Sequence, residues 1–277
     1  MKNSYKRPSY IFFILMLLSG FTYSQEPVDT SYSSLATPTI NNMIIMGRAP
    51  IVTIQVSGYY DIGLMDMASE DNTIFNLIDF RHGRNFGTRY GFGFEIKGKF
   101  ALHKQGNIRL TGGFSYNRFQ SNFIVASPDG KVSYNVFSPF IGIENSFTPD
   151  RRFKPYIGLE IIPSIINGHA NFDTTNILTP NVPVNVDLSI KNAFRFGFAV
   201  EFGFEYSFSN YIGWNLGMKI THANVFGRES KIDPTANEIY LNDEKIFPYI
   251  PYAGWKQFVF SSFFTGINFY FGMKDKR

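Results

Sequence analysis

Apolar and polar residues alternate strictly along parts of this chain. The clearest example is residues 193–208, where even positions hold large apolar side chains and odd positions hold small or charged ones. The apolar set is Phe194, Phe196, Phe198, Val200, Phe202, Phe204, Tyr206 and Phe208. A period of two held over this whole segment predicts a β-strand with one apolar face, because a helix would scatter both sets around its circumference.

The same alternation predicts seven further strands. It is regular near residues 51–64 and 89–100. Weaker candidates lie near 107–119, 131–147, 153–166, 211–225 and 256–272. In the segment 131–147 the apolar positions change from even to odd around Ser138-Pro139, which predicts a β-bulge. The segment 153–166 is apolar on both faces, so its orientation stays open.

The connections between these strands alternate between long and short. Long ones are expected at 65–88, 167–192 and 226–255, and short ones after residues 100, 147 and 208. Short turns at one end and long loops at the other are typical of outer-membrane barrels, whereas an immunoglobulin-like sandwich has no reason for this asymmetry. The pattern predicts an all-β fold, a transmembrane antiparallel up-and-down β-barrel of about eight strands.

The amino-terminal region predicts an exported protein. Residues 1–24 combine a basic start at Lys2, Lys6 and Arg7 with a short apolar run and small residues, as in a cleavable signal peptide. Residues 25–50 are interpreted as a flexible periplasmic lead-in, although Met43–Met46 could instead plug the lumen or pair with a strand edge. Residues 51–277 are interpreted as the barrel.

Composition narrows the function classes. The formal net charge of +4 includes three cations in residues 1–24, so 4 − 3 = +1 remains after cleavage, and nothing points to a nucleic-acid partner. The chain has no cysteine, which excludes disulfides and thiolate metal sites. Its 31 Phe and 16 Tyr fit an aromatic outer surface.

Charged residues on the polar strand faces are expected to point into the barrel. They are Asp61, Arg89, Glu95, Lys97, Lys99, Arg109, Glu144, Glu160, Arg195, Glu201, Glu205 and Lys219. Six are acidic and six are basic. An eight-stranded barrel is just wide enough to be filled by side chains, so a salt-bridged plug is favoured over a narrow ion pathway. Frequent glycine on the same face indicates crowding.

With these strands laid out, residues 51–272 resemble the small eight-stranded outer-membrane barrels of the OmpA, OmpX and OmpW-like group and the Bacteroidota porin-family β-barrel proteins. The final strand, Phe263-Phe264-Thr265-Gly266-Ile267-Asn268-Phe269-Tyr270-Phe271-Gly272, is similar to their aromatic carboxy-terminal strand. The resemblance implies a Gram-negative outer membrane, periplasmic termini, and outer-membrane lipid and the barrel-insertion machinery as partners. Phe269 and Phe271 are then the candidate insertion signal.

Catalytic and cofactor motifs are weak. Thr221-His222-Ala223-Asn224 is similar to the His-x-Ser-Asn segment of barrel-type lipid A deacylases, but Asn224 stands at the serine position, so the nucleophile is missing. The histidines have no metal-binding spacing, and no phosphate-loop or dinucleotide motif occurs, so no enzyme activity, metal or cofactor is expected.

Three functions therefore remain. The first is a non-catalytic structural or surface-interaction barrel, with a ligand or protein bound at the long extracellular loops. The alternatives are a narrow porin or hydrophobic-solute carrier, and a lipid-modifying enzyme.

Overall fold

A computed structural model describes residues 49–68, 86–123, 130–176, 179–231, 237–244 and 255–272. The predicted signal peptide, most of the lead-in and Met43–Met46 lie outside these residues. No helix within the described ranges is long and apolar enough to cross a bilayer.

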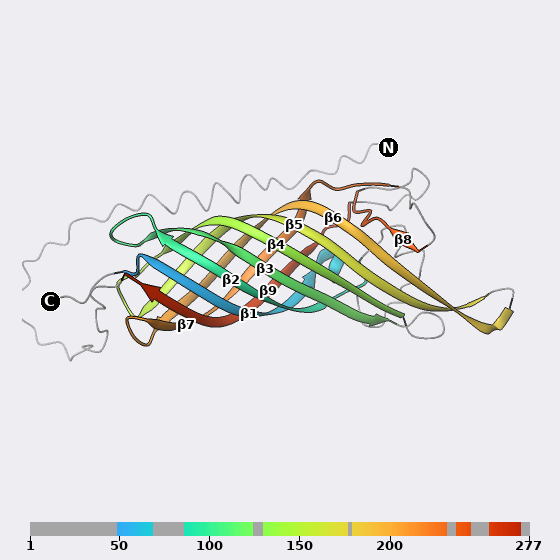
Figure 1. Ribbon diagram of the computed structural model, residues 1–277, viewed down its shortest axis with the longest axis horizontal. Helices are drawn as coiled ribbons and strands as arrows, with labels where there is room; N and C mark the ends of the chain where they lie inside the picture. Colours follow the sequence, from blue (N-terminus) through green and yellow to red (C-terminus); the bar gives the residue numbers. More distant parts are fainter. Residues whose placement is uncertain are drawn as a thin grey trace, which may run out of the picture. The chain divides into compact units, whose positions relative to one another are not determined.

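Eight long antiparallel strands close into a barrel (Figure 1), which confirms the all-β barrel predicted from the sequence. Each strand pairs with its neighbours in the chain, and the ring closes where the last long strand meets the first. The strands are β1 (Val52–Leu64), β2 (Tyr90–Ala101), β3 (Ile108–Phe123), β4 (Gly130–Ser146), β5 (Phe153–Asn176), β6 (Thr179–Ser207), β7 (Ile212–Phe226) and β9 (Val259–Phe271).

Two smaller elements lie in the connections. The 3-10 helix η2 (Met65–Met67) follows β1, and β8 (Glu238–Ile239) runs parallel to β6 and pairs with it at Ser189 and Ile190. Both belong to the end of the barrel that carries the long connections, which is called the loop end here. The opposite end, called the turn end, carries the short connections and both ends of the barrel sequence, because Val52 pairs with Phe271.

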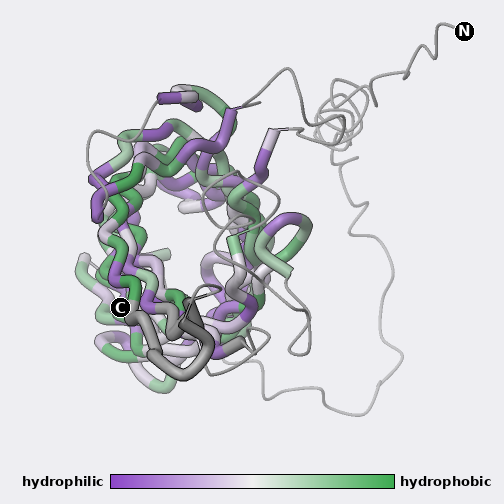
Figure 2. Tube along the Cα trace, turned by 90° about the vertical axis from the view of Figure 1, so that its right-hand side faces the viewer, coloured by the Kyte–Doolittle hydropathy of each residue, from purple (hydrophilic) through white to green (hydrophobic). Residues whose placement is uncertain are grey.

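Strand alternation separates two faces of the barrel wall. Along β6, Phe194, Phe196, Phe198 and Phe202 are exposed on the outside, whereas Arg195, Glu201 and Glu205 are buried in the interior. Figure 2, a view along the barrel, shows hydrophilic and hydrophobic residues alternating along the strands. The outside is therefore apolar and the inside polar, the reverse of a soluble domain.

The predicted bulge in β4 is wrong. Pairing with β3 runs without a shift from Ile108 opposite Asn145 to Phe123 opposite Gly130. Val132, Tyr134 and Val136 are buried inside, in the same phase as Glu144. Their apolar character reflects an apolar lumen at the loop end. The structure also fixes the orientation of β5, which the sequence left open. Ile161 and Ile165 face outward, and Ile162 and Ile166 face the lumen.

The long loop predicted at 167–192 is also wrong. β5 and β6 continue as a paired hairpin to Asn176 opposite Thr179, and Figure 1 shows this hairpin reaching beyond the other strands. A register shift between Ile166 and Gly168 accompanies the extension. Gly168 fits there because an added Cβ would lie 2.5 Å from the Ser133 carbonyl oxygen.

Candidate functional site

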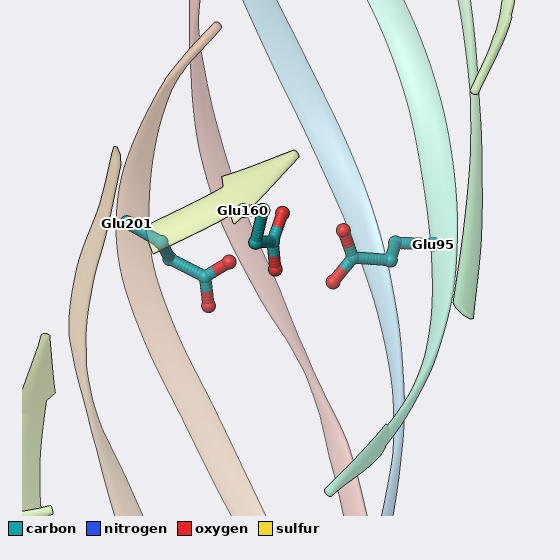
Figure 3. A group of neighbouring side chains, drawn as sticks. All are labelled: Glu95, Glu160 and Glu201. Atoms are coloured by element: carbon teal, nitrogen blue, oxygen red, sulfur yellow. The ribbon is translucent and has the colours of Figure 1, made fainter. Parts of the chain in front are cut away.

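The middle of the barrel holds a buried cluster of opposite charges. Lys97 of β2 and Lys219 of β7 lie among three glutamates, Glu95, Glu160 and Glu201, whose carboxylates converge from three different strands (Figure 3). Lys97 Nζ lies 2.7 Å from Glu160 Oε1 and also contacts Glu201. Lys219 Nζ lies 2.7 Å from Glu95 Oε2 and 2.5 Å from Glu160 Oε2.

A second charged cluster lies nearer the turn end. Lys99 Nζ is 2.8 Å from both Glu144 Oε2 and Glu205 Oε1. Arg109 contacts the same two glutamates and donates from Nη2 to Glu205 Oε1 over 2.9 Å. Each cation therefore links two other strands, β4 and β6. Burial of these groups demands such pairing, because an unpaired charge away from water is costly.

Lys154 of β5 was missed by the sequence analysis. It is fully buried near the turn end, donates to Ser207 Oγ, and its Nζ lies 4.3 Å from the Tyr270 ring centroid. The alternation along β5 could have identified it, because Lys154 and Glu160 are both at even, inward-facing positions. With Lys154 the two clusters hold five cations and five carboxylates: Lys97, Lys99, Arg109, Lys154 and Lys219 against Glu95, Glu144, Glu160, Glu201 and Glu205.

The three central glutamates have the grouping of a cation site. Ligand oxygens of Glu95, Glu160 and Glu201 lie within 4.8 Å of one another. The ammonium groups of Lys97 and Lys219 already contact all three carboxylates. Two cations against three carboxylates leave this cluster one negative charge in excess, which the one excess cation of the second cluster balances. The chemistry of the three glutamates is therefore that of an ion-pair network.

Aromatic rings fill the space between the charges. Gly203 and Gly217 pair across β6 and β7, and a Cβ on Gly217 would lie 2.4 Å from Cζ of Phe264. Tyr156 packs beside Gly203 and donates to Glu201 Oε1 over 3.0 Å. The inward glycines thus make room for large side chains, as the sequence pattern indicated.

An apolar core fills the lumen at the loop end, beyond the charged clusters. Strand residues such as Phe119, Tyr134 and Ile166 pack with Phe86 from the β1–β2 connection and Phe258 from the β7–β9 connection. The rings of Phe86 and Phe258 are 4.9 Å apart. Long connections therefore fold into the barrel mouth and supply part of its core.

A polar latch fixes the β7–β9 connection over this core. Arg195 of β6 donates from Nε and Nη2 to the two carboxylate oxygens of Asp243, each over 2.9 Å. Asn224 of β7 donates to Asp243 Oδ2 over 2.8 Å and accepts from the Phe258 backbone N–H over 2.7 Å. Asp66 of η2 accepts from the Gln257 backbone N–H over 2.6 Å. Arg195, predicted for the lumen network, thus serves the latch.

Two other predicted network residues lie elsewhere. Asp61 is buried but hydrogen-bonded, accepting from Asn117 Nδ2 over 2.9 Å and from Ser262 Oγ over 2.5 Å. Arg89 precedes β2, is partly exposed and has its guanidinium 5.3 Å from the ring centroid of Tyr90, with no ion pair to any residue that the structure describes.

The β1–β2 and β7–β9 connections together form a cap over the loop end, and burial lowers the pKa of one group in this cap. Lys256 is buried against the Phe86 ring, 4.5 Å from its centroid, and desolvation lowers the pKa of its ammonium group to about 8 despite the opposing attraction of Asp243 and Asp66. Burial likewise raises the pKa of Asp66. Both shifts belong to the β1–β2 and β7–β9 connections.

Aromatic side chains surround the turn end. Tyr206, Phe208, Phe269 and Phe271 are exposed there, and Trp214 donates from Nε1 to Thr265 Oγ1 over 2.7 Å. Phe269 and Phe271 lie on the outer face of β9, paired across to Ile54 and Val52. They occupy the place in which an interfacial aromatic girdle is expected.

Comparisons with known proteins add little to this geometry. No family model and no curated sequence matches the chain. Similar solved structures include Neisserial surface protein A, with 13% identity, 80% of this chain and 99% of that chain covered, and a TM-score of 0.42. The attachment invasion locus protein Ail of Yersinia pestis has 11% identity, coverages of 79% and 97%, and a TM-score of 0.33. The outer membrane protease OmpT of Escherichia coli has 10% identity, coverages of 86% and 99%, and a TM-score of 0.38. The barrel assignment rests on the strand pairing and on the closure between β1 and β9.

Proposed function

We propose that this protein spans the outer membrane of a Gram-negative bacterium as a non-catalytic barrel that presents its loop end to the exterior for structural or surface-interaction roles. The turn end, with both ends of the barrel sequence, then faces the periplasm. The observation that carries the proposal is the inverted polarity of the wall, with exposed aromatic and aliphatic side chains outside and paired charges inside. Closure leaves no unpaired barrel edge to meet hydrocarbon.

The height of the apolar belt supports membrane insertion. On β4 and its turn, outward residues run from Phe137 to Phe147, over 147 − 137 = 10 residue steps, and are apolar except for Asn145. At roughly 3.3 Å per residue and a tilt of about 40°, this corresponds to ~25 Å, the usual height of the apolar band on such barrels.

A row of polar side chains lies where the apolar belt ends on the side of the loop end, which is called its upper boundary. Tyr116, Phe137, Ile165 and Phe194 form one outward row across β3 to β6. Directly beyond it, Asn135 accepts from Tyr116 Oη over 2.8 Å and donates to Asn167 over 3.0 Å, and Asn167 donates to Asn192 over 2.9 Å. Such amides need water or headgroups, so hydrocarbon ends below them.

The filled lumen favours a non-conducting barrel over the alternative of a narrow porin or solute carrier. Along the axis, two ion-pair clusters are followed by the apolar core and the Arg195–Asp243 latch. An ion passing through would have to break these pairs without replacing them.

The enzyme alternative receives no support from the one candidate motif. His222 Nε2 lies 3.4 Å from Arg228 Nη2, whereas Asn224 at the serine position is buried in the cap and holds the latch. A histidine next to a guanidinium, with asparagine in place of the motif's serine, is poorly suited to acyl transfer. The proposal is therefore a barrel without catalysis.

The test combines folding and conductance. The chain without residues 1–24, folded into detergent micelles, should show a β-rich circular dichroism spectrum and a mobility shift on gels between boiled and unboiled samples. In planar bilayers it should show no steady conductance, and its expression should leave lipid A mass unchanged. A soluble protein without the mobility shift would refute the membrane barrel, steady conductance would favour the porin, and a lipid A mass change would favour the enzyme.

A further inference from the structure

A hollow of about 370 Å³ lies on the outer face of β3, β4 and β5 near the loop end. It is lined by Arg118, Lys131, Ser133, His169 and Asn171. All five residues point outward from the barrel, in the strand rows that follow the upper boundary of the apolar belt. The hollow is thus separate from the lumen and from the latch.

Two cations, Arg118 and Lys131, line this hollow. Neither Arg118 nor Lys131 makes an ion pair with any residue that the structure describes, although the lumen cations Lys97, Lys99, Arg109 and Lys219 all do. His169 is paired, with Nε2 2.8 Å from Asp187 Oδ1. The positive charge of the hollow therefore comes from the arginine and the lysine, while the Ser133 hydroxyl donates to the His169 carbonyl oxygen over 3.4 Å.

The depth of the hollow matches lipid headgroups. Arg118 lies one row beyond Tyr116, and Lys131 is opposite Asn122, four residues further along β3. At ~3.3 Å per residue the two Cα positions are about 13 Å apart along the strand, beginning at the hydrocarbon boundary. The headgroup region occupies roughly 5–7 Å on each side of a bilayer, so Arg118 lies within this layer and Lys131 beyond its outer edge. Both side chains line the same hollow, so the hollow extends from the headgroup layer outward.

We infer that this hollow binds the phosphate groups of outer-leaflet lipid headgroups. The inference rests on the proposed membrane insertion. Guanidinium and ammonium groups are the usual partners of phosphate, and a negatively charged headgroup held at the belt edge would neutralise both cations. A flexible lysine and a forked arginine on adjacent strands suit a lipid with two separated phosphates.

The test measures binding of bisphosphorylated lipid A to the full barrel folded in detergent, with completely dephosphorylated lipid A and inorganic pyrophosphate as comparison probes. The wild-type barrel should bind the phosphorylated lipid, and binding should weaken with added salt. R118Q/K131Q should lower the affinity about a hundredfold, near tenfold for each charge-assisted contact. The matched control K104Q/R151Q removes two exposed cations at the turn end and should change the affinity less than twofold.

Heat-dependent gel mobility of each variant separates failure of the barrel from failure of the site. If R118Q/K131Q folds and binds as the wild type does, or if dephosphorylated lipid binds equally well, the inference is wrong. Equal affinity for free pyrophosphate would also overturn it, because the site would then select a soluble anion. If the double variant fails to fold, the single variant K131Q, with K104Q as its control, gives the same comparison at about tenfold.

Discussion

Arg195 and Asp243 form a buried two-point ion pair that ties the β7–β9 connection to the barrel wall. Both hydrogen bonds measure 2.9 Å, and the exposed fractions of the two side chains are 2% and 0%. Asp243 also accepts from the Glu229 backbone N–H over 3.1 Å. A single carboxylate therefore fixes both the strand and the returning loop, which makes it the central contact of the cap.

Replacing Asp243 by asparagine should release the cap. D243N keeps the shape but leaves Arg195 with only the partly exposed Glu229 as an acidic partner. Loss of one partner in a buried pair costs about 3–5 kcal/mol, and the remaining pair with Glu229 should reduce this to ~2–3 kcal/mol. Limited proteolysis of the folded barrel should show faster cleavage in residues 227–258. E244Q, at an exposed neighbour, is the control, and equal cleavage of both variants would contradict the latch.

The stability of the cap should rise with pH in an alkaline window. The pKa of Lys256 is lowered from 10.5 to about 8 when the chain is folded, so the unfolded state binds more protons between these values. Stability should therefore rise from pH 8 to about pH 10.5, by up to ~3 kcal/mol, and the gain should be lost again as pH falls from 10.5 to 8.

Urea unfolding in micelles at pH 7.5, 9 and 10.5 measures this window. K256M removes the titrating group, so the difference between wild type and K256M isolates Lys256 from the other lysines and tyrosines. A difference that does not change with pH would contradict the assignment.

The central charges should behave as one coupled unit. K97M leaves Glu95, Glu160 and Glu201 with Lys219 as their single contacting cation and should destabilise the barrel by about 3–5 kcal/mol. Adding E201Q should recover part of this loss, giving a coupling energy of ~1–3 kcal/mol in a double-mutant cycle. Urea midpoints of the two single variants and the double variant provide the measurement. Additive effects would show that Lys97 and Glu201 act independently.

The outward and inward faces of a strand could be predicted wherever one face meets lipid and the other meets the charged part of the lumen. Along residues 194–208 each outward position is apolar and each inward one small or charged, so the alternation fixes the phase. At Val132, Tyr134 and Val136 this logic failed, because the lumen there is covered by Phe86 and Phe258 and favours apolar side chains as well. A sequence pattern cannot distinguish apolar packing inside from lipid outside.

The sequence predicted which residues belong to the candidate site better than it predicted which of them are in contact. Period two identified buried charges such as Lys97 and Glu205, but which cation meets which carboxylate depends on strands far apart in the chain. Arg195 was separated from the central clusters by the connection that carries Asp243, and this fold-back leaves no periodic signal. Arg118 lay at the end of a predicted strand, and its partners on β4 and β5 follow only from the register.

The position of the hydrocarbon boundary can be measured with two arginine substitutions on the outer face. Ile141 lies within the apolar belt of β4, with an exposed fraction of 55%, whereas Gln120 of β3 points outward two rows beyond Tyr116. I141R should cost about 2–4 kcal/mol in lipid, and Q120R about 0–1 kcal/mol, because the penalty for arginine falls toward the interface. Reversible unfolding in phospholipid vesicles compares the two variants with the wild type. If both cost the same, the apolar belt does not end between Tyr116 and Gln120, and the proposed depth of the Arg118 and Lys131 hollow falls with it.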